Sequence, residues 1–113
     1  MKIIRNKITL QELNEMAYNS FGNLVKAVVD VKKEIIAVDA ELHSDEEALL
    51  LENGSKQRDL WGINFYIELE GDDFIEYDSM INLRPSQNNR SRGVDNPEIR
   101  EKIKAIVDKL VEK

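Results

Sequence analysis

Residues 60–68 alternate between apolar and polar side chains, and this pattern limits the folds open to the chain. The apolar members occupy every second position and are Trp61, Ile63, Phe65 and Ile67. Because successive side chains of a strand point to opposite faces, a period of two predicts a strand with one face on a core. A similar alternation covers residues 74–84, and Pro85 ends it. The two runs predict a β-hairpin that turns at residues 70–73.

Another hairpin is predicted earlier in the chain. Residues 24–31 and 35–42 are rich in β-branched residues, and the polar connection of residues 32–34 has the length of a hairpin turn. Neither run alternates cleanly, which indicates that at least one of the two strands is covered on both faces.

Capping signals predict three helices. Thr9 and Ser44 are each followed by a glutamate three residues later, which is the capping-box pattern. The first helix would run from Thr9 to Gly22, and the second from residue 45 to about residue 52. The third would begin near residues 95–98, where an Asx cap precedes a proline.

The predicted order is therefore α-β-β-α-β-β-α. Two hairpins most simply join into a four-stranded, mostly antiparallel sheet, with the terminal helices on its apolar face. We expect an α+β fold in one domain over residues 1–113, because the chain has 113 residues of which 42% are apolar. The absence of cysteine excludes disulfides, thiol nucleophiles and thiolate metal sites.

Composition also bears on location and partners. No stretch reaches the roughly 20 apolar residues that a membrane helix needs, and residues 1–7 do not resemble a signal peptide. We therefore expect a cytoplasmic protein with no membrane contact. The net charge of −6 argues against general nucleic-acid binding, since phosphate contacts need a positive surface.

The segment 79–94 reverses this acidic pattern, because it contains arginines and no acid. Guanidinium groups and the donors of Ser, Asn and Gln suit a phosphate or a carboxylate. The predicted ligand-binding residues are Asn82, Arg84, Ser86, Gln87, Asn89, Arg90 and Arg92. They favour a non-enzymatic protein that binds an anionic small molecule or a protein partner. The alternative is a surface loop whose arginines pair with nearby acids.

A second candidate site lies where the first hairpin meets the second helix. Asp39, Glu41 and His43 are two residues apart, so they would share a face of the strand. Imidazole and carboxylates can bind a divalent metal or exchange protons. The candidate catalytic residues are His43 and Glu41, and the candidate metal ligands are Glu41, His43 and Asp45.

These residues support an alternative function, a small hydrolase or nuclease. His43 would act as general acid or base beside Glu41, while Arg84 and Arg90 would stabilise phosphate charge. The structural alternative is a solvated acidic strand end in which a local hydrogen bond satisfies His43. Whether the protein is an enzyme stays open, and no signal identifies a cofactor. A homodimer through the weakly charged strand 24–31 is a further possibility.

Four segments carry a family resemblance: residues 26–31 (KAVVDV), 41–47 (ELHSDEE), 54–57 with 59–64 (GSKQ, DLWGIN), and 81–87 with 89–91 (INLRPSQ, NRS). In these segments the chain resembles an uncharacterised family of small bacterial and archaeal proteins, known as a domain of unknown function. The resemblance covers nearly the whole chain. It implies one cohesive domain, and it assigns no activity, substrate, cofactor or catalytic residue.

Overall fold

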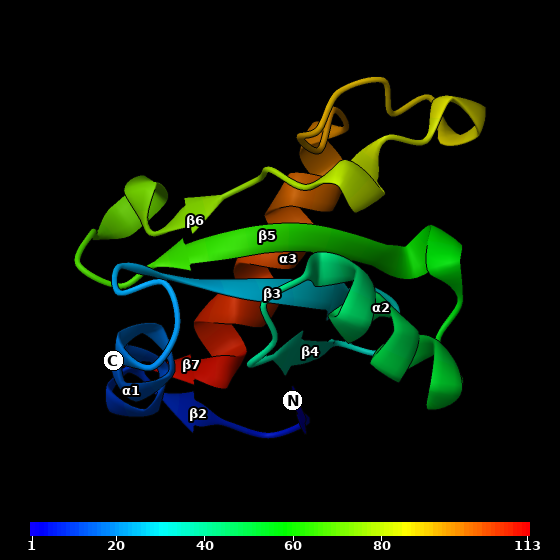
Figure 1. Cartoon of the computed structure of the whole chain (residues 1–113). Coiled ribbons are helices and arrows are strands. Elements are labelled where there is room, and N and C mark those ends of the chain that lie inside the picture. Colours follow the sequence, from blue (N-terminus) through cyan, green and yellow to red (C-terminus); the bar gives the residue numbers. More distant parts are fainter.

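The alternating strand of the sequence is β5 (Leu60–Tyr66), which lies near the middle of a five-stranded antiparallel sheet. The computed structural model describes all 113 residues. Along its whole length β5 pairs with β3 (Leu24–Asp30), and β3 pairs in turn with β4 (Ile35–Val38). The edges are β1 (Lys2–Ile4) and β6 (Ile75–Glu76), so the order is β1-β4-β3-β5-β6 (Figure 1).

The predicted four-stranded sheet therefore needs two corrections. Lys2–Ile4 is too short to show a strand period in the sequence, yet it adds a fifth strand because it pairs antiparallel with β4. A separate two-stranded parallel sheet joins β2 (Ile8–Thr9) to β7 (Val111–Glu112) and links the two ends of the chain. The strand predicted at residues 24–31 is central and pairs on both sides, so it has no free edge through which a homodimer could form.

The fourth predicted strand is also much shorter than expected. Only Ile75–Glu76 pairs with β5, and the chain then leaves the sheet through short 3₁₀ turns at Met80–Asn82 and Pro85–Gln87. Two further 3₁₀ turns, Gln57–Asp59 and Gly71–Asp73, flank β5 and β6. In place of a strand backbone, the side chain of Asn82 forms hydrogen bonds with β5.

Two of the three helix starts match the sequence prediction. Thr9 accepts a hydrogen bond from the Glu12 N–H at 3.1 Å before α1 (Leu10–Tyr18), and Asn96 caps α3 (Pro97–Leu110). The start of α2 (His43–Glu52) is different. The helix begins after Leu42, and no side chain caps it, so the predicted Ser44 cap was wrong. Ser44 already lies within the first turn of the helix.

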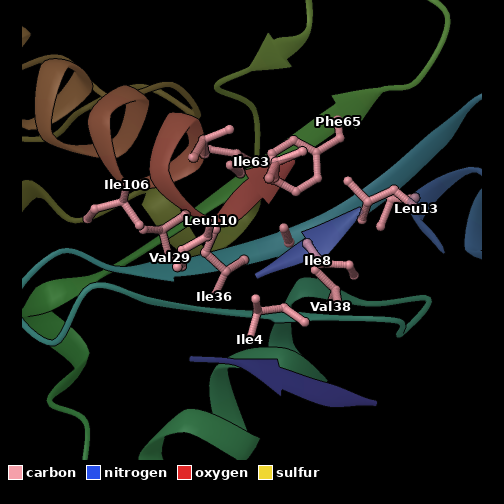
Figure 2. Close-up of a cluster of buried hydrophobic side chains, with 14 of the residues drawn as sticks. Ile4, Ile8, Leu13, Val29, Ile36, Val38, Ile63, Phe65, Ile106 and Leu110 are labelled. Atoms are coloured by element: carbon pink, nitrogen blue, oxygen red, sulfur yellow. The ribbon is translucent and has the colours of Figure 1, made fainter. Parts of the chain in front are cut away.

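The helices cover both faces of the sheet (Figure 1). On one face, α1 and α3 pack on a core of 20 buried side chains that includes Val29, Ile63 and Leu110, and Figure 2 shows strand and helix side chains meeting there. On the other face, α2 packs through Leu50 on a smaller cluster that contains Val28. Because both faces of β3 are covered, its sequence does not alternate between apolar and polar residues. This confirms the expectation that at least one strand of the first hairpin is covered on both faces.

Candidate functional site

The face of the sheet that carries α2 is only partly covered. Beyond the first turn of α2, a cavity of about 380 Å³ opens over β3, β5 and β6. Four polar side chains of the sheet line it: Lys26, Asn64, Tyr66 and Glu76. Its rim includes His43 and Ser44 from α2, together with Asp78 and Arg92 from the segments that follow β6.

Strand register brings the sheet residues together. Lys26 of β3 lies opposite Asn64 of β5, and Asn64 lies opposite Glu76 of β6. Directly opposed residues share a face of the sheet and lie close enough to interact. Three strands therefore place an ammonium, an amide and a carboxylate in one row beside the start of α2.

His43 faces the sheet from α2 and is 8% exposed. Its Nε2 lies 2.8 Å from the backbone oxygen of Ile63, which can only accept, so the proton of the neutral ring is on Nε2. Nδ1 then carries the lone pair. It makes no further hydrogen bond of ordinary geometry and is not fully buried, and the nearby Asn64 side chain is the group that could accept a hydrogen bond from it once the ring is protonated. Burial lowers the pKa of His43, which keeps the ring neutral near pH 7.

Asn64 provides a second acceptor without a donor. Its Nδ2 donates to Glu76 Oε1 at 2.9 Å and to the backbone oxygen of Asp78 at 3.3 Å. Both partners are pure acceptors, which fixes the orientation of the amide. The Oδ1 atom is fully buried and has no partner in the protein. Tyr66 also donates to Glu76 Oε1, so the other carboxylate oxygen of Glu76 makes no hydrogen bond to the protein.

The lining combines charges of both signs. Lys26 and Arg92 are positive, and Glu76 and Asp78 are negative. Arg92 Nε donates to Asp78 Oδ1 at 2.7 Å, and the two side chains are 55% and 42% exposed. The ammonium of Lys26 lies 5.1 Å from the ring centre of Phe21. The ion pair between Arg92 and Asp78 is exposed and therefore contributes little to stability, so Arg92 can turn toward a ligand at small cost.

Three residues of the predicted arginine loop, Asn82, Arg84 and Asn89, are buried and make hydrogen bonds within the protein. Arg84 is 8% exposed, and its guanidinium donates to the backbone oxygens of Ile81, Gln57 and Leu60. It also lies over the ring of Trp61, 4.5 Å from the ring centre. These contacts join the loop to the start of β5 and direct the guanidinium into the protein.

The two buried asparagines of the loop act in a similar way. Asn82 Nδ2 donates to the backbone oxygens of Gly62 and Arg92, and Asn89 Nδ2 donates to those of Asn82 and Gly93. The remaining predicted loop residues are exposed and do not line the cavity: Ser86, Gln87 and Arg90. Of the seven predicted ligand-binding residues, only Arg92 lines it.

The predicted acidic cluster divides between two places. Glu41 and Asp39 line a separate cavity of about 160 Å³, while His43 lines the larger one. Asp39 has a φ of 71°, which turns the chain at the strand end and breaks the alternation that would have aligned the three residues. Asp45 is exposed, and no three His, Asp or Glu side chains are grouped closely enough to hold a metal ion.

The sheet residues of the cavity were missed in the sequence. Asn64 and Tyr66 occupy the positions of β5 that alternate with its core residues, and such positions usually face solvent. The signal that could have found them is the second helix. The predicted second helix must bury its apolar residues against the sheet. If it packs on the face that carries Asn64 and Tyr66, that face does not point wholly to solvent.

Comparison with known proteins places the chain in a family. No curated protein and no solved structure shows significant similarity to it. None of its helices has the length and apolar character needed to span a membrane. One family, described as "Protein of unknown function (DUF5674)", matches residues 2–110, which is nearly the whole chain. The chain therefore belongs to the DUF5674 family, as the resemblance of its segments indicated.

Proposed function

We propose that this protein binds a small polar molecule with an anionic group in the cavity at the start of α2. The observation that carries the proposal is a pair of acceptors without donors, Asn64 Oδ1 and His43 Nδ1, on two residues that line one cavity. More than nine in ten buried polar groups of native proteins have a hydrogen-bond partner. A buried acceptor that the protein leaves without a donor is suited to a ligand that brings one.

The anionic group is supported by the other side of the cavity. The first backbone N–H groups of α2 have no side-chain cap, and helix N-termini favour anions through these groups and the helix dipole. Arg92 and Lys26 add two cations to the lining. The expectation of an anionic ligand is thus kept, but its site moves from the loop to the cavity that Arg92 borders.

The test is a thermal-shift screen with phosphate compounds, carboxylates, nucleotides and amino acids. A ligand at 100 times its Kd stabilises by about 2.7 kcal/mol, which raises Tm by roughly 4 °C or more for a domain of this size. Arg92→Met should reduce the shift. Arg90→Met is the matched control, since it removes the same charge from the same loop but away from the cavity. A uniform lack of stabilisation across the screen would argue against the proposal.

A hydrolase is the second candidate, and the fixed tautomer of His43 is the observation that favours it. Its Nδ1 carries the lone pair on a residue that lines the cavity, and this atom can accept a proton from an attacking water. Glu41 does not line this cavity, so Ile63 rather than Glu41 orients the ring. Assays with chromogenic phosphate, ester and glycoside substrates would test this. Activity that survives His43→Ala would exclude His43 as the base.

We further propose that the protein acts in the cytoplasm of a bacterium or archaeon. Its cysteine-free, acidic composition supports this setting, because no disulfide ties the fold to an oxidising compartment. Fractionation of cells that carry the gene would test the location, and recovery from a membrane or secreted fraction would contradict it.

A further inference from the structure

Three residues that line the cavity carry acceptors that need donors: Asn64, His43 and Glu76. Asn64 Oδ1 is buried and unpartnered, His43 Nδ1 carries a lone pair, and one oxygen of Glu76 makes no hydrogen bond to the protein. Asn64 lies opposite Glu76 in the strand register, and its side chain is close enough to the His43 ring to raise its pKa. The three residues that carry these acceptors therefore line one cavity.

An ammonium group matches these acceptors better than a hydroxyl or an amide. It offers three N–H donors from one atom, whereas a hydroxyl offers one and an amide nitrogen two in a plane. The charge of Glu76 also favours a cation, because hydrogen bonds between charged partners are about twice as strong as neutral ones. Lys26 cannot take this place while its ammonium lies over Phe21.

Other groups of the cavity lining favour an anion. The uncapped N–H groups of His43 and Ser44, the Ser44 hydroxyl and the free guanidinium nitrogens of Arg92 are all donors at the rim. A helix start alone is a weak indication of a site. Here Asn64, which is 6% exposed and has a buried, unpartnered amide oxygen, lines the same cavity and adds an independent sign of a ligand.

We propose that the ligand is a zwitterion of the α-amino acid class. Its ammonium group lies between Asn64, His43 and Glu76, and its carboxylate binds at the start of α2 and Arg92. This inference rests on the proposed function, since it names the ligand class of the same cavity. The two cations and two anions of the lining sum to zero, which matches a ligand without net charge.

The volume of the cavity and its apolar lining residues indicate which α-amino acids would fit. A volume of about 380 Å³ lies at the lower end of the range for small-molecule sites, which is about 300–1,000 Å³. Leu42 and Met80 are 54% and 63% exposed and flank the opening. Apolar side chains at this position suit an amino acid whose own side chain is apolar.

The experiment uses the only histidine of the chain as a probe. Side-chain ¹⁵N resonances of His43 are followed while the full-length protein is titrated with apolar amino acids, their N-acetyl derivatives and the corresponding decarboxylated amines. Amino acids should shift the Nδ1 resonance in a saturable manner. The N-acetyl derivatives and the amines should bind at least tenfold more weakly, because each lacks one of the two charged groups.

A conservative variant tests the ammonium end. Glu76→Gln keeps the shape and one acceptor but removes the charge, so it should weaken amino acid binding at least tenfold. Asp72→Asn is the matched control, since Asp72 is an exposed acid outside the cavity. The wild-type titrations do not depend on the folding of either variant.

The outcomes separate the two proposals. If N-acetyl amino acids, simple carboxylates or phosphate compounds shift His43 as strongly as amino acids do, the zwitterion inference is wrong while the anion-binding function stands. If no compound of the panel or of the thermal-shift screen moves the His43 resonances, both are wrong. Equal binding by wild type and Glu76→Gln would also overturn the placement of the ammonium.

Discussion

The side chain of Asn82 makes the two hydrogen bonds with the Gly62 backbone that a neighbouring strand would otherwise make. The Gly62 N–H donates to Asn82 Oδ1 at 2.8 Å, and Asn82 Nδ2 donates to the Gly62 oxygen at 3.0 Å. Asn82 is fully buried, and a Cβ added to Gly62 would lie 2.5 Å from Ser79 Cβ. The pair therefore lets the chain leave the sheet after β6 without exposing or orphaning the backbone of β5.

Replacement of Asn82 should test this role. Asn82→Ala would leave the buried N–H and C=O of Gly62 without partners, and we expect a loss of about 2–4 kcal/mol in the free energy of unfolding. Urea denaturation followed by circular dichroism would measure it. Ser86→Ala, at an exposed position of the same loop, should change stability by less than about 0.5 kcal/mol. A tolerated Asn82→Ala would show that water satisfies Gly62 equally well.

Arg84 leads to a second prediction, because its contacts are internal. Arg84→Met should lower the free energy of unfolding by about 2–4 kcal/mol, since three backbone oxygens lose a charged donor. Arg90→Met should leave stability nearly unchanged, because Arg90 is exposed. If Arg84→Met were as stable as wild type but lost a ligand, Arg84 would be a binding residue, as its place in a basic loop suggested.

The contrast between these two arginines shows how far the sequence could lead. The period of residues 60–68 and the caps at Thr9 and Asn96 are local signals, and the structure confirmed each of them. The role of Arg84 depends on carbonyl groups more than 20 residues away, at Gln57 and Leu60. Composition alone does not reveal such long-range pairing. A loop whose donors bind backbone oxygens of the protein therefore cannot be distinguished in the sequence from a loop whose donors bind a ligand.

The candidate site shows the same limit. His43 and Arg92 were selected from the sequence, and both line the cavity. Asn64 and Glu76 were not selected, because their proximity depends on the register between β5 and β6. Strand register is fixed by the whole buried face, and a short strand such as β6 offers too few residues to show it. Lys26 of β3 was not selected either, because its position opposite Asn64 depends on the register between β3 and β5.

Glu46 gives a prediction for the dependence of stability on pH. This carboxyl belongs to α2 and is fully buried, with Oε2 accepting from the Ala40 N–H and Oε1 unpartnered, and burial raises its pKa to about 9. Between its unfolded pKa near 4.5 and its folded pKa, the native state holds a proton that the unfolded state has released. Stability should therefore be greatest at low pH for this group and should fall as pH rises toward 9.

Glu46→Gln should remove this loss. Relative to wild type, the variant should gain about 2 kcal/mol of stability between pH 6.5 and pH 8, since each pKa unit corresponds to 1.36 kcal/mol. His43 is present in both proteins, so its titration cancels in the comparison. Glu52→Gln, at an exposed position of the same helix, is the control and should show no such gain. Parallel pH profiles for Glu46→Gln and wild type would mean that Glu46 is ionised in the folded protein.

His43 provides the most direct check of the site, because it is the only histidine and its ring can be observed alone. Burial lowers its pKa, while the Ile63 carbonyl and the neighbouring Asp78 raise it and Lys26 lowers it further. The folded ring should thus stay neutral at pH 7, with its proton on Nε2, and should titrate below 6.5. The unfolded ring binds a proton first as the pH falls, so this group should reduce stability as pH decreases through 6.5.

Two-bond ¹H–¹⁵N spectra distinguish the tautomers and give the pKa in one titration. We expect the Nε2–H form with Nδ1 unprotonated, which is the form that both the binding and the hydrolase proposals require. In Asn64→Leu the ring should titrate at still lower pH, because a buried acceptor near its protonated form is removed. A ring protonated at pH 7, or one with its proton on Nδ1, would place a donor where both proposals need an acceptor, and the cavity would then have to be reinterpreted as a site for anions alone.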